Sequence, residues 1–160
     1  MRSHMGSCYA RAMTYRESEL PVVDSGDRSV LVIGIGGEVA GLNRETGDPL
    51  WRNKLSGGGV GEIFIALRFG VLAVSAGVNR LFRLDYRTGA TLWSVETSAS
   101  GRATIVIEPD LIFVGKPGNV DAFAHDGTWR WRQPLQGMGF GRIALALPGN
   151  VAQADEVGSG

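Results

Sequence analysis

The sequence predicts an all-β protein made of repeated four-stranded antiparallel sheets. Glycine accounts for 24 of the 160 residues and proline for only 6, without a collagen-like period of three, which indicates many tight turns. Apolar residues make up 44% of the chain and charged residues 20%, a composition that supports a packed core in a single domain. The third observation is a sequence repeat with a period of about 40 residues, rich in Val, Ile, Phe and Trp.

Three segments of the chain align with one another. The first apolar runs cover residues 30–34, 71–75 and 111–115, and the second ones cover 38–43, 79–85 and 119–124. Each segment then ends in a glycine turn and a tryptophan. Trp51 and Trp93 are 42 residues apart, and Trp93 and Trp131 are 38 apart. β-Branched and aromatic residues broken by frequent glycines exclude paired-helix repeats of similar period.

A further short apolar piece precedes each segment, so each repeat is expected to form four strands. These pieces cover residues 20–23, 62–67 and 104–107, giving repeats over about 20–54, 62–96 and 103–133. Between the third and fourth strands of each repeat lies a turn glycine, which adopts a positive φ without a Cβ penalty. The turn glycines are Gly47, Gly89 and Gly127, each four residues before its tryptophan.

This arrangement resembles the blade repeat of quinoprotein-like β-propellers, the repeats named after pyrroloquinoline quinone (PQQ). The resemblance rests on the Thr-Gly-x-x-Leu-Trp pattern ending at Trp51 and Trp93. It implies that the fourth-strand tryptophan docks between adjacent blades, a role carried to Trp51, Trp93 and Trp131. The third repeat departs from the pattern, because its hairpin shortens to residues 125–127 and Trp129 replaces the leucine.

The ends of the repeat domain, expected over residues 12–155, look like parts of further blades. Residues 142–147 align with the opening strand of a fourth blade, followed by a short second strand at 151–154. Residues 12–17 read as a closing strand in which Tyr15 takes the place of the docking tryptophan. We expect a cloning remnant and N-terminal arm over 1–11 and a tail over 156–160.

Three full blades cannot close a ring, since closed propellers typically have four to eight. Two closures follow. In one, two chains meet head to tail and share their partial blades, which gives eight blades, the number usual for the family it resembles. In the other, the chain is a fragment or an open array that stacks on something else.

Composition excludes several function classes. Sixteen basic and 16 acidic residues give a formal net charge of zero, which argues against nucleic acid or an anionic membrane as partner. No apolar run reaches 18 residues, so no membrane span is expected. Cys8 is the single cysteine, so an intrachain disulfide is excluded. The compartment stays open between the cytoplasm and, if a signal sequence once preceded a lipid-bearing Cys8, the periplasm.

No catalytic motif stands out. Outside the first five residues the one histidine is His125, beside the third hairpin, where a surface or capping role is expected. Residues 34–37 are glycine-rich, but a strand-like segment follows them, which favours a β-hairpin over a dinucleotide loop. The chain has no vicinal cysteines and no long insertions, so the resemblance implies the architecture and no quinone, metal or other cofactor.

The sequence therefore favours a non-catalytic interaction or scaffold module that binds a protein or peptide and forms a homodimer completing one ring. The alternative is a small-molecule-binding sensor or enzyme with its site on the propeller axis. In that alternative Asn79, Arg80 and Asn119, near the strand turns, would line the site.

Overall fold

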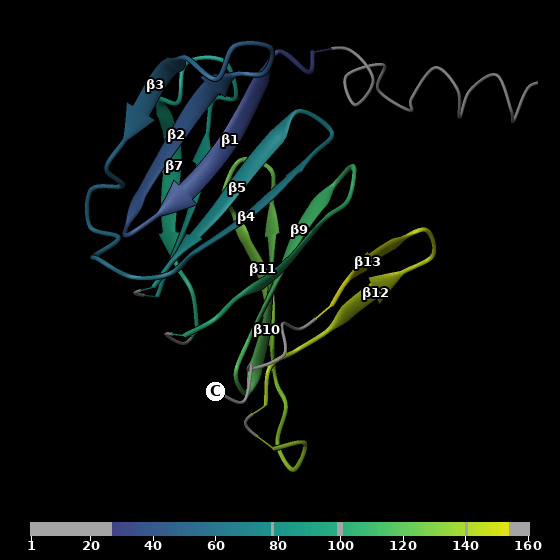
Figure 1. Ribbon diagram of the computed structural model, residues 1–160. Helices are drawn as coiled ribbons and strands as arrows, with labels where there is room; N and C mark the ends of the chain where they lie inside the picture. The colour runs from purple at the N-terminus through teal and green to yellow at the C-terminus, as the bar shows by residue number, and fades with distance from the viewer. Residues whose placement is uncertain (1–26, 78, 99–100, 140, 154–160) are drawn as a thin grey trace, which may run out of the picture.

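The computed structural model describes residues 27–77, 79–98, 101–139 and 141–153, and all regular structure in these residues is β (Figure 1). The strands are β1 (Val30–Ile35), β2 (Glu38–Asn43), β3 (Pro49–Asn53), β4 (Ile63–Arg68), β5 (Val71–Ala76), β6 (Arg80–Leu84), β7 (Thr91–Glu96), β8 (Thr104–Ile107), β9 (Leu111–Lys116), β10 (Asn119–Ala124), β11 (Trp129–Pro134), β12 (Leu145–Leu147) and β13 (Asn150–Ala152). The predicted all-β class is confirmed.

The strands form antiparallel meanders in chain order. Blade I is β1-β2-β3, blade II is β4-β5-β6-β7 and blade III is β8-β9-β10-β11. The strand predicted over 20–23, which would complete blade I, lies outside the described residues, as do residues 12–17 with Tyr15 and the whole of 1–11 and 156–160. Blades II and III begin within one residue of the expected boundaries, and blade III ends at Pro134.

Each blade has the same irregularity where its last two strands pair. A register shift falls between Gly41 and Leu42 in blade I, and between Arg83 and Leu84 in blade II. The third shift falls between Ala122 and Phe123. A bulge adds one residue to one strand and increases the local twist. Its recurrence at one position shows that the three sheets are repeats of one structure.

The strands β12 and β13 form a hairpin, called here the half-blade, which contacts β8. Its strands are shorter than the ranges predicted for an opening pair at 142–147 and 151–154. A Cβ placed on Gly115 would lie 2.9 Å from Ile143, just as one on Gly34 would lie 2.4 Å from Ile63. The half-blade therefore occupies the place of the first two strands of a blade following blade III.

The apolar core lies between the blades. One buried cluster joins blades I and II through residues such as Val39, Leu72 and Phe82. A second cluster joins blades II and III through residues such as Leu81 and Phe123. The first strands β4 and β8 contact each other, and the sheets follow one another as a fan from β1–β3 to β12–β13 (Figure 1). Each blade is thus stabilised by its neighbours.

Candidate functional site: the surfaces between blades

Trp51 of blade I docks on the turn of blade II. Its indole Nε1 donates a hydrogen bond to the carbonyl oxygen of Tyr86 at 3.2 Å. The ring covers Gly89 so closely that a Cβ on this glycine would lie 2.2 Å from the ring. On its other side the ring lies against Gly41 of its own blade. Trp51 is 9% exposed, because Gly41, Gly89 and the carbonyl of Tyr86 surround its ring.

Hydrogen bonds from polar side chains also join blades I and II. The Asn53 side-chain amide donates to the carbonyl oxygen of Gly89 at 2.7 Å. The Tyr86 hydroxyl donates to the carbonyl oxygen of Val30 at 2.8 Å and accepts from the Val30 amide at 2.9 Å. Because these bonds join side chains to backbone, they set the register of blade I on blade II.

Trp93 repeats the contact one blade further on. Its Nε1 donates to the carbonyl oxygen of His125 at 2.9 Å, and a Cβ on Gly127 would lie 3.0 Å from the ring. The guanidinium of Arg83 donates to the same carbonyl at 2.6 Å. Trp93 stays half-buried. The turn glycine of each following blade is therefore part of the platform for the preceding tryptophan, a role beyond the positive φ considered from sequence.

The turns of Gly47 and Gly89 share one hydrogen-bonding scheme, whereas the turn of Gly127 has Ala124 at the position of Asn43 and Asp85. The carboxylate of Asp85 accepts from the backbone amides of Thr88 and Arg87, and these bonds, with that of Thr88 first, lower the pKa of Asp85. The equivalent Asn43 accepts from the amides of two residues in the first turn. The glycines have φ of 77° at Gly47, 72° at Gly89 and 91° at Gly127.

Blade I exposes an apolar face on the side away from blade II. The first-blade face consists of Leu31, Ile33, Ile35, Ala40 and Leu42. Three of its residues are large and exposed: Leu31 at 55%, Ile33 at 39% and Ile35 at 77%. Beside them lies Gly47, where no described atom comes within 4 Å of the place a Cβ would take.

The opposite end of the array exposes Trp131. This side chain is 42% exposed and packs on Phe113 of its own blade, with ring centroids 5.9 Å apart. It meets no glycine turn within the described residues, in contrast to Trp51 and Trp93. The expected docking contact of Trp131 is therefore absent from this part of the chain. Val151 of the half-blade is also exposed at this end, which we call the third-blade end (blade III with β12 and β13).

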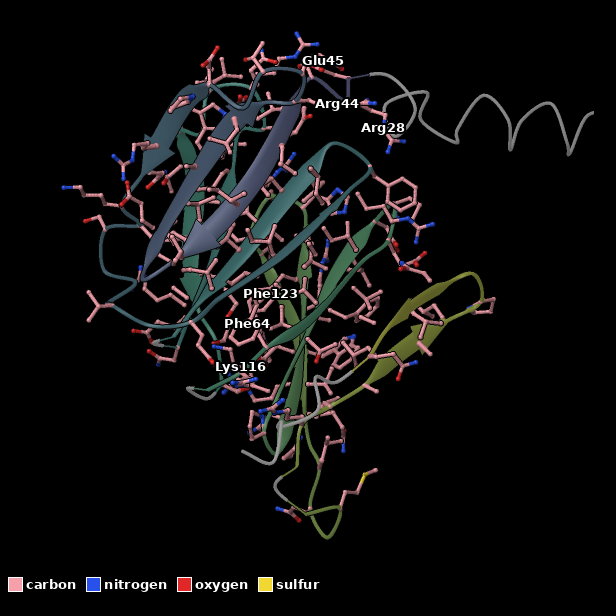
Figure 2. The ribbon with its side chains drawn as sticks, viewed as in Figure 1. Arg28, Arg44, Glu45, Phe64, Lys116 and Phe123 are labelled. Atoms are coloured by element: carbon pink, nitrogen blue, oxygen red, sulfur yellow. The ribbon has the colours of Figure 1, made fainter. Side chains whose placement is uncertain are left out.

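Blade III also contains a buried polar cluster that sequence reasoning missed. The carboxylate of Asp121 is 1% exposed, accepts from Arg132 Nε at 2.8 Å and accepts from the amide of Ser98 at 2.8 Å. Arg132 is thus the ion-pair partner of Asp121, and its own side chain stays 44% exposed. Lys116 is buried as well, and burial lowers its pKa to about 8 despite the nearby Asp121 charge. Figure 2 shows Lys116 far from Arg28 and Arg44.

The residues predicted for an axial site have structural partners. Arg80 donates to the Ser94 hydroxyl at 3.0 Å, and the carbonyl of Asn79 accepts from the amide of Thr97. Asn119 begins β10 and pairs with Lys116 in the ladder. His125 Nε2 bonds to the carbonyl oxygen of Glu108 at 2.8 Å. Asn79, Arg80, Asn119 and His125 thus lie at or near hairpin turns, and none of them lies in β4 or β8, the first strands of blades II and III.

A groove of about 1300 Å³ lies beside blades I and II, and its lining includes the charged side chains of Asp27, Arg44 and Arg87. Arg87 binds Asp27 at 2.7 Å, and Arg44 lies 3.6 Å from Glu45. Figure 2 shows Arg28, Arg44 and Glu45 close to one another near the start of β1. In the described ranges, no three His, Cys, Asp or Glu side chains gather as metal ligands. The same ranges contain no helix suited to crossing a membrane.

Solved structures with the same fold include propeller proteins of different function. BamB from Moraxella catarrhalis has a TM-score of 0.56 at 23% identity, over 74% of this chain and 36% of that one. A europium-containing methanol dehydrogenase has a TM-score of 0.57 at 17% identity, over 69% of this chain and 24% of that one. Quinohemoprotein alcohol dehydrogenase from Comamonas testosteroni has a TM-score of 0.53 at 22% identity, over 66% and 19%. This chain therefore spans about a third or less of these proteins.

Sequence comparison identifies the family. No curated protein matches the chain. The family described as outer membrane protein assembly factor BamB, one of PQQ-type repeats, matches residues 10–156. The resemblance of the repeats, the successive four-stranded blades and this match agree, and the chain belongs to the BamB family of PQQ-type β-propeller repeats.

Proposed function

We propose that the chain is a non-catalytic interaction module that completes a propeller ring by pairing with a second copy. The observation that carries this proposal is the apolar surface at both ends of the array. Leu31, Ile35 and Trp131 are exposed, although equivalent residues are buried or docked between blades. Large apolar patches on a folded surface mark places where proteins associate.

The polar groups of the blades support a structural role. The carboxylate of Asp121 accepts from Arg132 and Ser98, and the His125 ring bonds to the Glu108 carbonyl oxygen. The backbone carbonyl of His125 accepts from Trp93 and Arg83. Buried charges with such partners organise a fold more often than they perform a reaction. The similarity to BamB extends the proposal to protein partners, which would bind the loops or the funnel of the completed ring.

The ring is proposed to hold eight blades, three complete ones from each chain and two shared ones. The half-blade supplies the first two strands of each shared blade, and the closing strand predicted from sequence at residues 12–17 lies outside the described residues. The strand edges left open in one chain are then paired, as edges of sheets in water require.

Removal of residues 1–18 tests this pairing. The full chain should sediment at twice 17.0 kDa, and the shortened chain should become monomeric or aggregate. A soluble wild-type monomer at micromolar concentration, together with a harmless truncation, would contradict the ring. The alternative, a small-molecule-binding sensor or enzyme, predicts a ligand: at 100 times its dissociation constant a ligand adds about 2.7 kcal/mol of stability. A thermal shift with an alcohol or quinone would therefore contradict a purely structural role.

A further inference from the structure

We propose that the contact between blades II and III is a pH-sensitive joint, which opens locally when the Lys116 amine is protonated and closes when the amine is neutral. The joint contains a polar seam made of Ser75 in β5, Ser98 after β7, Lys116 in β9 and Asp121 in β10. This inference goes beyond the proposed function, because it concerns two blades of one chain and does not require a second copy.

The polar seam lies between the facing sheets of blades II and III. Along β9, Lys116 comes two residues after Val114, which belongs to the second buried cluster. Along β5, Ser75 comes two residues after Ala73 of the same cluster. Side chains two residues apart on a strand point to the same face of the sheet, so Lys116 and Ser75 point into this interface from opposite sides. Asp121 lies opposite Val114 in the ladder and shares its face.

The equivalent place between blades I and II is apolar. Lys116 and Ala76 each end the second of the four strands of their blade. Asp121 and Phe82 each lie two residues before the second residue of the register shift. Ala76 and Phe82 are buried in the cluster that joins blades I and II. Blade III thus places an amine and a carboxylate where blade II places apolar side chains.

The amine of Lys116 lacks the contacts that stabilise a buried charge. Lys116 is 1% exposed, and its Nζ has no hydrogen-bond partner among the described residues. The hydroxyl groups of Ser75 and Ser98 are likewise buried without a partner in the described ranges. The carboxylate of Asp121 already accepts from Arg132 and from the amide of Ser98. A protonated amine without water or hydrogen bonds is disfavoured, so the closed joint favours the neutral amine.

Other charged groups of the two facing blades have partners of their own. These pairs are Arg132 with Asp121, Arg102 with Glu62, Arg83 with the carbonyl oxygen of His125, and Arg68 with the ring of Phe69. The negative charge of Asp121 favours the protonated amine of Lys116, but burial has the larger effect and lowers the pKa of Lys116 from 10.5 to about 8. The charge of Lys116 is therefore not balanced by its surroundings in the closed joint.

Rising pH favours the closed joint. When the joint opens, Lys116 returns to water and regains its ordinary pKa of 10.5. Between about 8 and 10.5 the open joint therefore holds a proton that the closed joint has released, so closure becomes more favourable as the pH rises. Below that window the amine is protonated in both states, and the joint opens most readily. The cluster between blades I and II consists of apolar residues, so that contact stays closed when the polar seam opens.

Thiol labelling at two neighbouring positions tests the joint. Ser75→Cys and Val74→Cys place a thiol on opposite faces of β5, toward blade III and toward blade I, at positions that are both 0% exposed. Cys8→Ser in both chains removes the native thiol. The rate of reaction with an aromatic disulfide reagent is measured for each folded chain and divided, at each pH, by the rate of the same chain unfolded in urea. Circular dichroism establishes folding, and Ala73→Cys, on the same buried face, replaces Ser75→Cys if that chain does not fold.

We expect Ser75→Cys to react about tenfold faster than Val74→Cys, or more, at pH 7, and its relative rate to fall about tenfold or more from pH 7 to 10. Adding Lys116→Met should abolish this fall, whereas Lys54→Met, which removes the other lysine of the chain from an exposed position, should leave it unchanged. Equal rates at the two thiols would show that the blades open only together and would overturn the local joint. A relative rate that does not fall with pH, or that falls equally in the Lys116→Met chain, would overturn the role of Lys116.

Discussion

Substitution of Gly89 by alanine measures how much the docking of Trp51 contributes to stability. The alanine Cβ would lie 2.2 Å from the Trp51 ring, and the backbone φ of +72° adds strain for any L side chain. The strain in the left-handed region costs about 1–2 kcal/mol. Forcing a methyl group into a packed contact costs about 1–3 kcal/mol more. We therefore expect Gly89→Ala to lower the free energy of unfolding by about 2–5 kcal/mol.

Gly36→Ala is the matched control for the backbone strain. Gly36 also has a positive φ, of 57°, but no described atom lies within 4 Å of its Cβ position. This substitution should cost only the strain of about 1–2 kcal/mol. Urea unfolding followed by circular dichroism at one fixed protein concentration gives both values, since association would shift the apparent stability.

A double-mutant cycle separates the ring contact from everything else at Gly89. In a Trp51→Ala background the ring is gone, so Gly89→Ala should cost no more than Gly36→Ala does. The coupling between the two positions should then be about 1–3 kcal/mol. An equal cost of Gly89→Ala with and without the tryptophan would refute the claim that this glycine is the platform for Trp51.

Three further predictions concern other contacts. Trp51→Ala alone should cost about 3–5 kcal/mol, as for a large buried aromatic residue, while Trp131→Ala should cost far less in a chain diluted to the monomer; urea unfolding checks both. Asp121→Ala should cost about 1.5–3 kcal/mol, because it removes the charge-assisted hydrogen bond from Arg132 and the negative charge near the buried Lys116, whereas Glu45→Ala, in an exposed ion pair, should change stability by less than about 1 kcal/mol. Equal losses at Asp121 and Glu45 would disprove a role for the buried cluster. Lys116 has a folded-state pKa of about 8, below its ordinary value of 10.5, so the unfolded chain binds more protons between these pH values and stability should rise with pH across that window. Lys116→Met should flatten this rise in urea unfolding measured from pH 7 to 10, and an unchanged slope would argue against it.

The repeat made the fold predictable from the sequence. Glycine four residues before Trp51 and Trp93 located the hairpins, and β-branched runs located the strands. The platform role of Gly89 was not predictable, because it depends on how one blade stacks on the next. The cluster of Lys116 and Asp121 escaped prediction for a similar reason. Both residues lie in strands that read as ordinary, and only the packing of blade III brings the charges together away from water.

The surfaces at the two ends of the array show what a local sequence pattern does not determine. The sequence indicated that Trp131 occupies a docking position, and alignment alone could not say whether a platform exists for it. The exposed fractions of equivalent side chains show which faces are covered: Leu72 of blade II is buried, whereas Leu31 of blade I is exposed. An open face is a property of how many blades the assembly contains, which no single repeat encodes.

The mass of the wild-type chain over a concentration series tests closure of the ring most directly. Light scattering from about 1 to 100 μM should give a plateau at twice 17.0 kDa, because a closed pair has no open surface left to add further chains. A mass of 17.0 kDa throughout the series would contradict the account, and so would a mass that keeps growing with concentration, as an open head-to-tail array would show.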